Sequence, residues 1–132
     1  MAETARMILC DTNILIEFYK NNLQVVEELR RIGKDRLAVS AVTQAELYFG
    51  SINKAELRKI RQHLALLHHL SLDIPISTLF LQLMETYSLS HKLSLPDALI
   101  AATALSHDLE LYTLNIKDFR FIAGLNLHRP AA

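Results

Sequence analysis

Three acidic side chains occupy places in this sequence that apolar side chains usually hold. Asp11 and Asp97 are each followed by apolar residues at i+3, i+4 and i+7, and Glu46 has apolar neighbours at i−4, i−1 and i+3. Residues at these spacings share one face of a helix. We therefore expect all three carboxylates near helix starts, on or beside faces that point inward.

Three carboxylates that converge require a cation or a proton. Unit charges about 4 Å apart repel by about 4 kcal/mol at an effective dielectric constant of 20, so three pairs approach about 12 kcal/mol. Whole domains are stabilised by only about 5–15 kcal/mol. Oxygen ligands without His or Cys favour Mg²⁺ or Mn²⁺. Taken singly, however, Asp11 is also typical of an N-cap, Asp97 of a capping box, and Glu46 of a helix residue that points to water.

The elements that position these acids alternate along the chain. Strands are expected at residues 7–10, 37–39, 72–74 and 109–113, with a fifth at 125–127. Helices are expected at residues 11–20, 22–33, 40–49, 53–70 and 77–92, and from residue 94 onward. Such alternation predicts an α/β fold, a three-layer α/β/α arrangement with a central parallel sheet of four to five strands, in one domain over residues 1–132. Ligands of such sheets bind beyond the carboxyl ends of the strands.

Two further polar residues follow the expected strand at 109–113. Asn115 and Asp118 come from a strand end, at the level where the other acids are expected. Each is a candidate to hold a water molecule or a second metal ion.

Other classes of site lack their residue patterns. The six His residues show neither an HExxH spacing nor a Cys partner, and no glycine-rich nucleotide-binding loop is present. The apolar runs are too short to span a membrane or to form a secretory signal. A single Cys10 in an apolar run is typical of a core thiol in a reducing compartment, so we expect a cytoplasmic protein.

Four segments together resemble a known family. They are Asp11-Thr12-Asn13, Ser40 with Glu46, residues 95–104 and residues 113–119. In this order and spacing they look like the signature of PIN-domain ribonucleases, particularly the VapC-type toxins. The resemblance implies a Mg²⁺- or Mn²⁺-dependent endoribonuclease that a cognate antitoxin holds inactive and that is commonly a homodimer.

The resemblance also assigns roles to particular residues. Asp11 and Asp97 match the principal metal ligands, and Glu46 completes the acidic triad. Asn115 stands where the family often has Asp, so we expect one firmly held metal, with Asp118 as a substitute ligand for a second.

The implied reaction is hydrolysis of an RNA phosphodiester. Either Glu46 or the pair Asn115 and Asp118 would orient the attacking water, and the identity of the base stays open. Thr12, Asn13 and Thr113 would support the site by hydrogen bonds, or simply satisfy helix ends.

Charge is the remaining observation. The chain has 14 basic and 14 acidic residues, a net charge of zero that is unusual for a nucleic-acid-binding protein. Residues 30–61, however, hold eight basic against three acidic residues. This segment is either a set of solvated helix faces or a rim that faces RNA. The candidates for RNA contact are Arg30, Arg31, Lys34, Arg36, Lys54, Arg58, Lys59 and Arg61.

The partners and the competing functions follow from the same residues. Apolar stripes at residues 57–70 and 79–83 are candidates to receive an antitoxin segment or a second protomer. One alternative is a degenerate PIN-fold scaffold that binds RNA or protein without cleavage, as Asn115 indicates. A receiver-type phosphoacceptor domain is another, because it also has an Asp at a strand end, and a phosphatase of the haloacid-dehalogenase type is weaker still.

Overall fold

Four short parallel strands form the central sheet of the computed structural model, which describes residues 6–131. Their order across the sheet is β3-β2-β1-β4. The strands are β1 (Ile8–Cys10), β2 (Leu37–Ser40), β3 (His68–Leu70) and β4 (Glu110–Tyr112). The helices are α1 (Thr12–Tyr19), α2 (Leu23–Ile32), α3 (Ala41–Phe49), α4 (Lys54–Leu64), α5 (Ile74–His91) and α6 (Leu95–His107), with short 3₁₀ helices η1 (Lys34–Arg36) and η2 (Ile116–Asp118).

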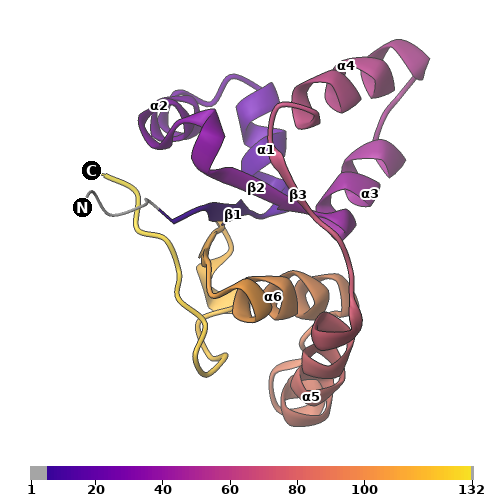
Figure 1. Ribbon diagram of the computed structural model, residues 1–132, viewed down its shortest axis with the longest axis vertical. Helices are drawn as coiled ribbons and strands as arrows, with labels where there is room; N and C mark the ends of the chain where they lie inside the picture. The colour runs from indigo at the N-terminus through magenta and orange to yellow at the C-terminus, as the bar shows by residue number, and fades with distance from the viewer. Residues whose placement is uncertain (1–5, 132) are drawn as a thin grey trace.

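Helices cover both faces of the sheet, so the three-layer prediction is confirmed. In Figure 1, α1, α2 and α4 lie on one side of the strands, whereas α6 lies on the other side with α5 packed outside it. The side chains of each strand alternate between two cores. Ile8 and Cys10 pack toward α1 and α2, and Leu9 between them packs toward α6. This alternation explains why β1 reads as an uninterrupted apolar run.

The helix starts follow their capping residues closely. Asn22, Ser40, Asn53 and Ser94 each cap a helix, with a side-chain oxygen that accepts a backbone N–H in the first turn. The prediction of these four starts from local sequence is confirmed, because a cap depends only on residues two or three positions apart.

Two predicted boundaries between residues 64 and 77 are wrong. The helix expected to reach residue 70 ends at Leu64, and residues 68–70 form strand β3 beside β2. The strand expected at residues 72–74 is instead the start of α5. Asp73, rather than Ser77, caps this helix by accepting the N–H of Ile76. The expected strand would end at Pro75. This residue instead lies in the first turn of α5, where proline is tolerated because its missing N–H has no partner there.

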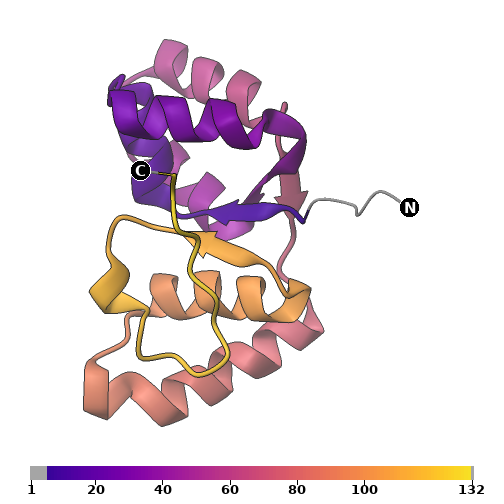
Figure 2. The same cartoon turned by 90° about the vertical axis from the view of Figure 1, so that its left-hand side faces the viewer.

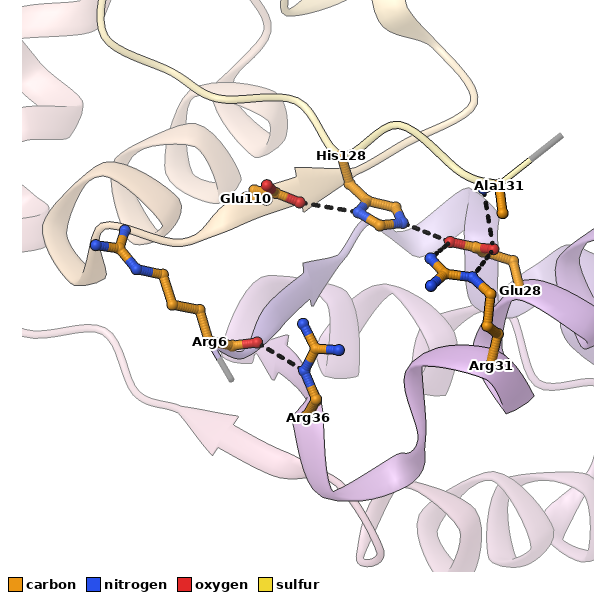
Figure 3. A network of polar contacts seen from close by, with 7 residues as sticks. All are labelled: Arg6, Glu28, Arg31, Arg36, Glu110, His128 and Ala131. Carbon is orange, nitrogen blue, oxygen red and sulfur yellow. Dashed lines mark hydrogen bonds and ion pairs between the residues drawn. The ribbon is translucent and has the colours of Figure 1, made fainter. Parts of the chain in front are cut away.

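The fifth strand is reduced to a single bridge between Leu111 and Leu127. The C-terminal tail follows β4 there and then crosses to α2, where the N–H of Ala131 donates to Glu28 (Figure 2). Figure 3 shows how the tail is fastened. His128 Nε2 lies 2.6 Å from Glu28 Oε2, and Arg31 also donates to the Glu28 carboxylate. Hydrogen bonds from Arg31, and then from His128, lower the pKa of Glu28 to about 2 although its burial opposes them.

Cys10 is fully buried, which raises the pKa of its thiol to about 12 and confirms the expected core thiol. Within residues 6–131, no helix has both the length and the apolar character needed to cross a membrane.

Candidate active site

The site lies where the direction of the strand crossovers reverses. From β1 the chain moves to β2 and β3 on one side, whereas β4 lies on the other side of β1. Ligands of open α/β sheets bind at such a reversal, beyond the carboxyl ends of the two strands. Asp11 directly follows β1, and Thr113 directly follows β4. The backbone N–H of Asp11 donates to Tyr112 O at 2.9 Å, which holds the two strand ends together.

Asp11 is the most deeply placed of the candidate acids, with an exposed fraction of 4%. It is the N-cap of α1. Its Oδ1 accepts the N–H of Thr12 at 2.8 Å, and its Oδ2 accepts the hydroxyl of Thr113 at 2.8 Å. Burial raises the pKa of Asp11, and the charges of Glu46 and Asp118 raise it further, although the two hydrogen bonds lower it. The predicted supporting roles of Thr12 and Thr113 therefore have a geometric basis.

Asp97 comes from the opposite helical layer. It is half-buried in the first turn of α6, and its N–H donates to the capping hydroxyl of Ser94 at 3.2 Å. Burial and then the charge of Asp11 raise the pKa of Asp97 to about 6, with a smaller opposing effect from Ser94. Asp118 and Glu46 act on it in the same direction. The pKa of Asp97 therefore depends on three other acidic residues as well as on its own burial.

Glu46 reaches this centre from α3, but its surroundings differ from the expectation. Both Glu46 and Phe49 are exposed, so the predicted inward face of this helix is wrong. The buried residues of α3 are Thr43 and Leu47, which belong to a different face. The hydroxyl of Thr12 donates to Glu46 Oε1 at 2.7 Å. Glu46 is therefore a rim residue whose carboxylate is oriented by the first residue of α1.

The loop after β4 contributes through backbone and side chain in different ways. Asn115 is exposed, and its backbone N–H donates to the Thr113 hydroxyl at 3.0 Å. Asn13 Oδ1 accepts the N–H of Leu114 at 3.3 Å, which ties this loop to α1. Asp118, half-buried in η2, is the loop residue whose charge acts on both Asp11 and Asp97. This placement favours Asp118 over Asn115 as a fourth acidic group.

The basic residues of segment 30–61 do not gather at one place. Lys34 and Arg36 belong to η1, which precedes β2, so they lie at the amino ends of the strands, opposite the acids. Arg31 is paired with Glu28. Lys59, on α4, lines a groove that also includes Glu46. The structure thus separates these basic residues into a group on α4 and a group at the amino ends of the strands. Contact with RNA stays a prediction for each group.

Sequence reasoning did not assign three residues beside the acids to this site. His91, Lys92 and Lys117 line a hollow that also includes Asp97 and Asp118. Their proximity in sequence to the acids could have indicated them, because Lys92 precedes Asp97 by five positions and Lys117 adjoins Asp118.

The donor set fits a hard divalent cation in kind. Asp11, Asp97, Glu46 and Asp118 offer carboxylate oxygens, and their mutual repulsion is relieved by positive charge. In residues 6–131, no three Asp, Glu, His or Cys side chains already surround one point in the manner of a formed metal site. In this part of the chain, Asp11 is the one of these carboxylates that is held by hydrogen bonds on both oxygens.

Comparison with known proteins identifies the family. Residues 8–125 match the family model of the PIN domain. The chain is 35% identical to Ribonuclease VapC10 of Mycobacterium tuberculosis, over 96% of this chain and the whole of that protein. The chain is a VapC-type member of the PIN-domain family.

Solved structures place this PIN domain among toxin–antitoxin proteins. A toxin-antitoxin complex from Klebsiella pneumoniae is 33% identical, with a TM-score of 0.77 over 89% of this chain and 94% of that one. VapBC-1 from nontypeable Haemophilus influenzae is 29% identical, with a TM-score of 0.78 over 92% and 96% of the two chains. The recognition of a VapC-type PIN domain from sequence is confirmed.

The sheet order excludes the receiver alternative. Receiver domains have the strand order 2-1-3-4-5, whereas the described strands of this PIN domain have the order β3-β2-β1-β4.

Proposed function

We propose that this protein is a Mg²⁺- or Mn²⁺-dependent endoribonuclease that hydrolyses RNA phosphodiester bonds and is the toxin of a toxin–antitoxin pair. The observation that carries the proposal is the set of carboxylates around Asp11 and Asp97 at the strand reversal, where burial, and then the charges of the neighbouring carboxylates, raise both pKa values. The similarity of this chain to Ribonuclease VapC10 also supports RNA hydrolysis.

The residues divide the work of the site according to their burial. Asp11 and Asp97 would hold the ion, and Glu46 or Asp118 would complete its ligands. When bound, a divalent ion stabilises negative charge on the phosphoryl group and lowers the pKa of water. Thr113 and the Thr12 N–H fix the Asp11 carboxylate, whereas the Thr12 hydroxyl orients Glu46. The exposed Glu46 carboxylate, with its direct access to water, is suited to orient the attacking water and accept its proton.

A cleavage assay tests the proposal. The purified protein, free of any partner, is incubated with total RNA in Mn²⁺ or EDTA, beside Asp11→Asn and Asp97→Asn variants. We expect the wild type to cleave with Mn²⁺ but not with EDTA, and neither of these two variants to cleave. Asp35→Asn is the matched control. Asp35 lies in η1, at the amino ends of the strands and opposite the acids, so its substitution should leave cleavage intact. Cleavage by both site variants would indicate a contaminant. A folded wild type that cleaves no RNA would favour the scaffold alternative.

A groove beside Glu46 supports the antitoxin as partner. It has a volume of about 680 Å³ and lies between α1, α3 and α4. Apolar and aromatic side chains such as Ile16, Phe18 and Tyr19 line it, and Tyr19 is fixed by a 2.8 Å hydrogen bond between its hydroxyl and His63 Nδ1. Glu46 is part of the same lining. An antitoxin segment with apolar side chains and one cation would fill the groove and place its charge against the acids.

Co-purification tests this partner. The product of the gene immediately upstream is co-expressed with the wild type or with Ile16→Asp, which places a charge in the groove. We expect the wild type to retain the partner and the variant to lose it. Leu23→Asp is the control, because Leu23 is 71% exposed on α2 and lies outside the groove lining. If both variants retain the partner equally, the groove is not the antitoxin-binding site.

We further propose a homodimer in the cytoplasm. Exposed apolar side chains on α5 support it, since Leu81 is 59% and Leu89 is 95% exposed. Sedimentation equilibrium of the wild type and of a Leu81→Asp, Leu89→Asp variant tests the dimer, and a monomeric wild type would overturn it.

A further inference from the structure

A second hollow borders the candidate active site on the side away from the groove. Its volume is about 330 Å³, which suits one nucleotide rather than a peptide helix. Asp97 and Asp118 form one part of its lining, and the turn between α5 and α6 forms another. A strand that occupied this hollow would therefore continue directly onto the acidic cluster.

One side of the hollow is an ordered aromatic stack. His91 lies against Phe121 with ring centroids 4.1 Å apart and planes inclined by 11°. Tyr87 meets the edge of Phe121 at 5.1 Å, and its hydroxyl accepts the N–H of Ala123 at 3.1 Å. Phe121 is thus held from two directions, and the exposed His91 ring ends the stack. A preformed stack of this kind binds an unpaired base at little cost in ordering.

Two cations stand beside the same hollow. Lys92 and Lys117 both line it and both are exposed. Neither ammonium forms a salt bridge with a carboxylate in the part of the chain that the structure describes. The backbone position of Lys92 is well defined. Lys92 is the C-cap of α5, it has the left-handed conformation with φ of 53°, and its N–H donates to Tyr87 O. Unpaired cations beside an acidic centre favour the approach of a phosphate that the acids alone would repel.

We propose that this hollow is a subsite for one nucleotide of single-stranded RNA, whose phosphate binds Lys92 and Lys117 and whose base stacks on His91. The inference rests on the proposed ribonuclease function and adds a place for the nucleotide next to the scissile phosphate. It assigns RNA contact to residues outside segment 30–61. Stacking on an exposed ring requires a base that is not paired, so the substrate is single-stranded at this point.

Binding measurements in EDTA separate the subsite from catalysis. The affinity of a short fluorescein-labelled single-stranded RNA is measured by anisotropy at several salt concentrations, for the wild type and for Lys92→Gln, Lys117→Gln. Each phosphate that is no longer neutralised reduces the slope of log K against log salt by about 0.7, and both lysines bind the same phosphate. We therefore expect a slope smaller by about 0.7 and an affinity about fourfold weaker near about 0.15 M salt. Arg120→Gln, Arg129→Gln carries the same charge change at two exposed residues that line a different hollow, and it should bind within about twofold of the wild type, because it removes no proposed RNA contact.

The stacking residue has its own pair of variants. His91→Ala should weaken binding at least about fivefold, the lower range for loss of one stacked base, whereas His91→Phe keeps a flat ring and should restore it. Circular dichroism and melting curves of each variant check that the fold is intact. Single-stranded DNA of the same sequence is the second ligand. A loss shared by RNA and DNA assigns the subsite to phosphate and base, and a loss confined to RNA adds the 2′-hydroxyl; both results support it.

Several outcomes would overturn the subsite. The first is an unchanged salt slope in the lysine pair, which would mean that these lysines only balance Asp97 and Asp118. The second is a wild type that does not bind RNA, and the third is a His91→Ala variant that binds as the wild type does. RNA cleavage in Mn²⁺ reports on the proposed function independently. A wild type that cleaves RNA while the lysine variant keeps its affinity would leave the ribonuclease in place and remove only the subsite.

Discussion

Asp97→Asn should stabilise the metal-free protein, although it removes a residue of the candidate site. Burial and the charge of Asp11 raise the pKa of Asp97 from 3.8 to about 6. The folded protein therefore binds a proton at Asp97 more tightly than the unfolded chain does. Ionised Asp97 disfavours folding above pH about 6, and the penalty falls as the pH decreases toward the unfolded pKa. An amide of the same shape carries no such penalty.

The size of the effect follows from the pKa. A difference of about two pKa units corresponds to at most about 3 kcal/mol. Asp97 is half-buried, so solvent screening reduces this to about 1–2 kcal/mol. For a chain of 132 residues, this raises the melting temperature by about 4–7 °C at pH about 7.5. At pH about 4 the two proteins should differ little, because wild-type Asp97 is then protonated in the folded state and already about 40% protonated in the unfolded state, so most of the penalty is gone.

The assay is urea denaturation and thermal melting in EDTA at both pH values. Glu56→Gln is the matched control. Glu56 is also the third residue of its helix, and its N–H also donates to the capping side chain, here Asn53. Its carboxylate is not among the charges that raise the pKa of Asp11 or Asp97, and it accepts the N–H of Ile52, so Glu56→Gln should destabilise slightly. Saturating Mn²⁺ should raise the wild-type melting temperature, and Asp97→Asn should lose most of that rise.

Two results would refute the reasoning. If metal-free Asp97→Asn is no more stable than the wild type at pH about 7.5, burial and the neighbouring carboxylates do not penalise ionised Asp97 as the structure implies. If its advantage is the same at pH about 4, the gain arises from packing or propensity rather than from charge.

Two further predictions concern hydrogen bonds of single carboxylates. Thr113→Val leaves the buried Oδ2 of Asp11 without its donor, so we expect a loss of about 1–3 kcal/mol in the free energy of unfolding, measured with urea, and slower RNA cleavage. Glu28→Gln concerns pH. The pKa of Glu28 is lowered from 4.5 to about 2, so its ionised form stabilises the fold above pH about 4.5, and this contribution is lost as the pH falls toward 2. The Gln variant should therefore show a flatter dependence of stability on pH between about 5 and 2.

Each of these variants has a conservative partner. Thr113→Ser keeps the hydroxyl and should retain most of the stability and activity; a Val variant that equals it would show that the bond to Asp11 contributes little. Glu110→Gln alters the other carboxylate that faces His128. The Glu110 side chain is 49% exposed, so this variant should leave the loss of stability at acid pH unchanged. An acid limb that is equally steep in Glu28→Gln and in the wild type would contradict the role of the network in Figure 3.

The sequence alone was sufficient for features that depend on neighbours within one helical turn. Four helix caps, the buried run of β1 and the position of Asp11 at its end are of this kind, because a cap or a strand end is decided by residues two to four positions apart. The motif set also identified the family, which the comparison confirmed.

Pairings across the sheet decided what the sequence left open. Residues 68–70 continue a helical pattern locally, yet they pair with residues 38–40 of β2, and that long-range contact ends α4. In the same way, a cluster of basic residues in the sequence does not tell which edge of the sheet each will reach, so Lys34 and Lys59 lie apart.

The acidic centre combines both kinds of information. Sequence spacing placed each acid near a helix start, but only the adjacency of β1 and β4 brings Thr113 to Asp11, 102 positions away. The packing of α6 on the other face then brings the half-buried Asp97 within reach of the same charge. Local sequence determines which groups a strand or helix end presents, whereas the order of strands determines which ends meet, because that order depends on burial and pairing summed over the whole chain.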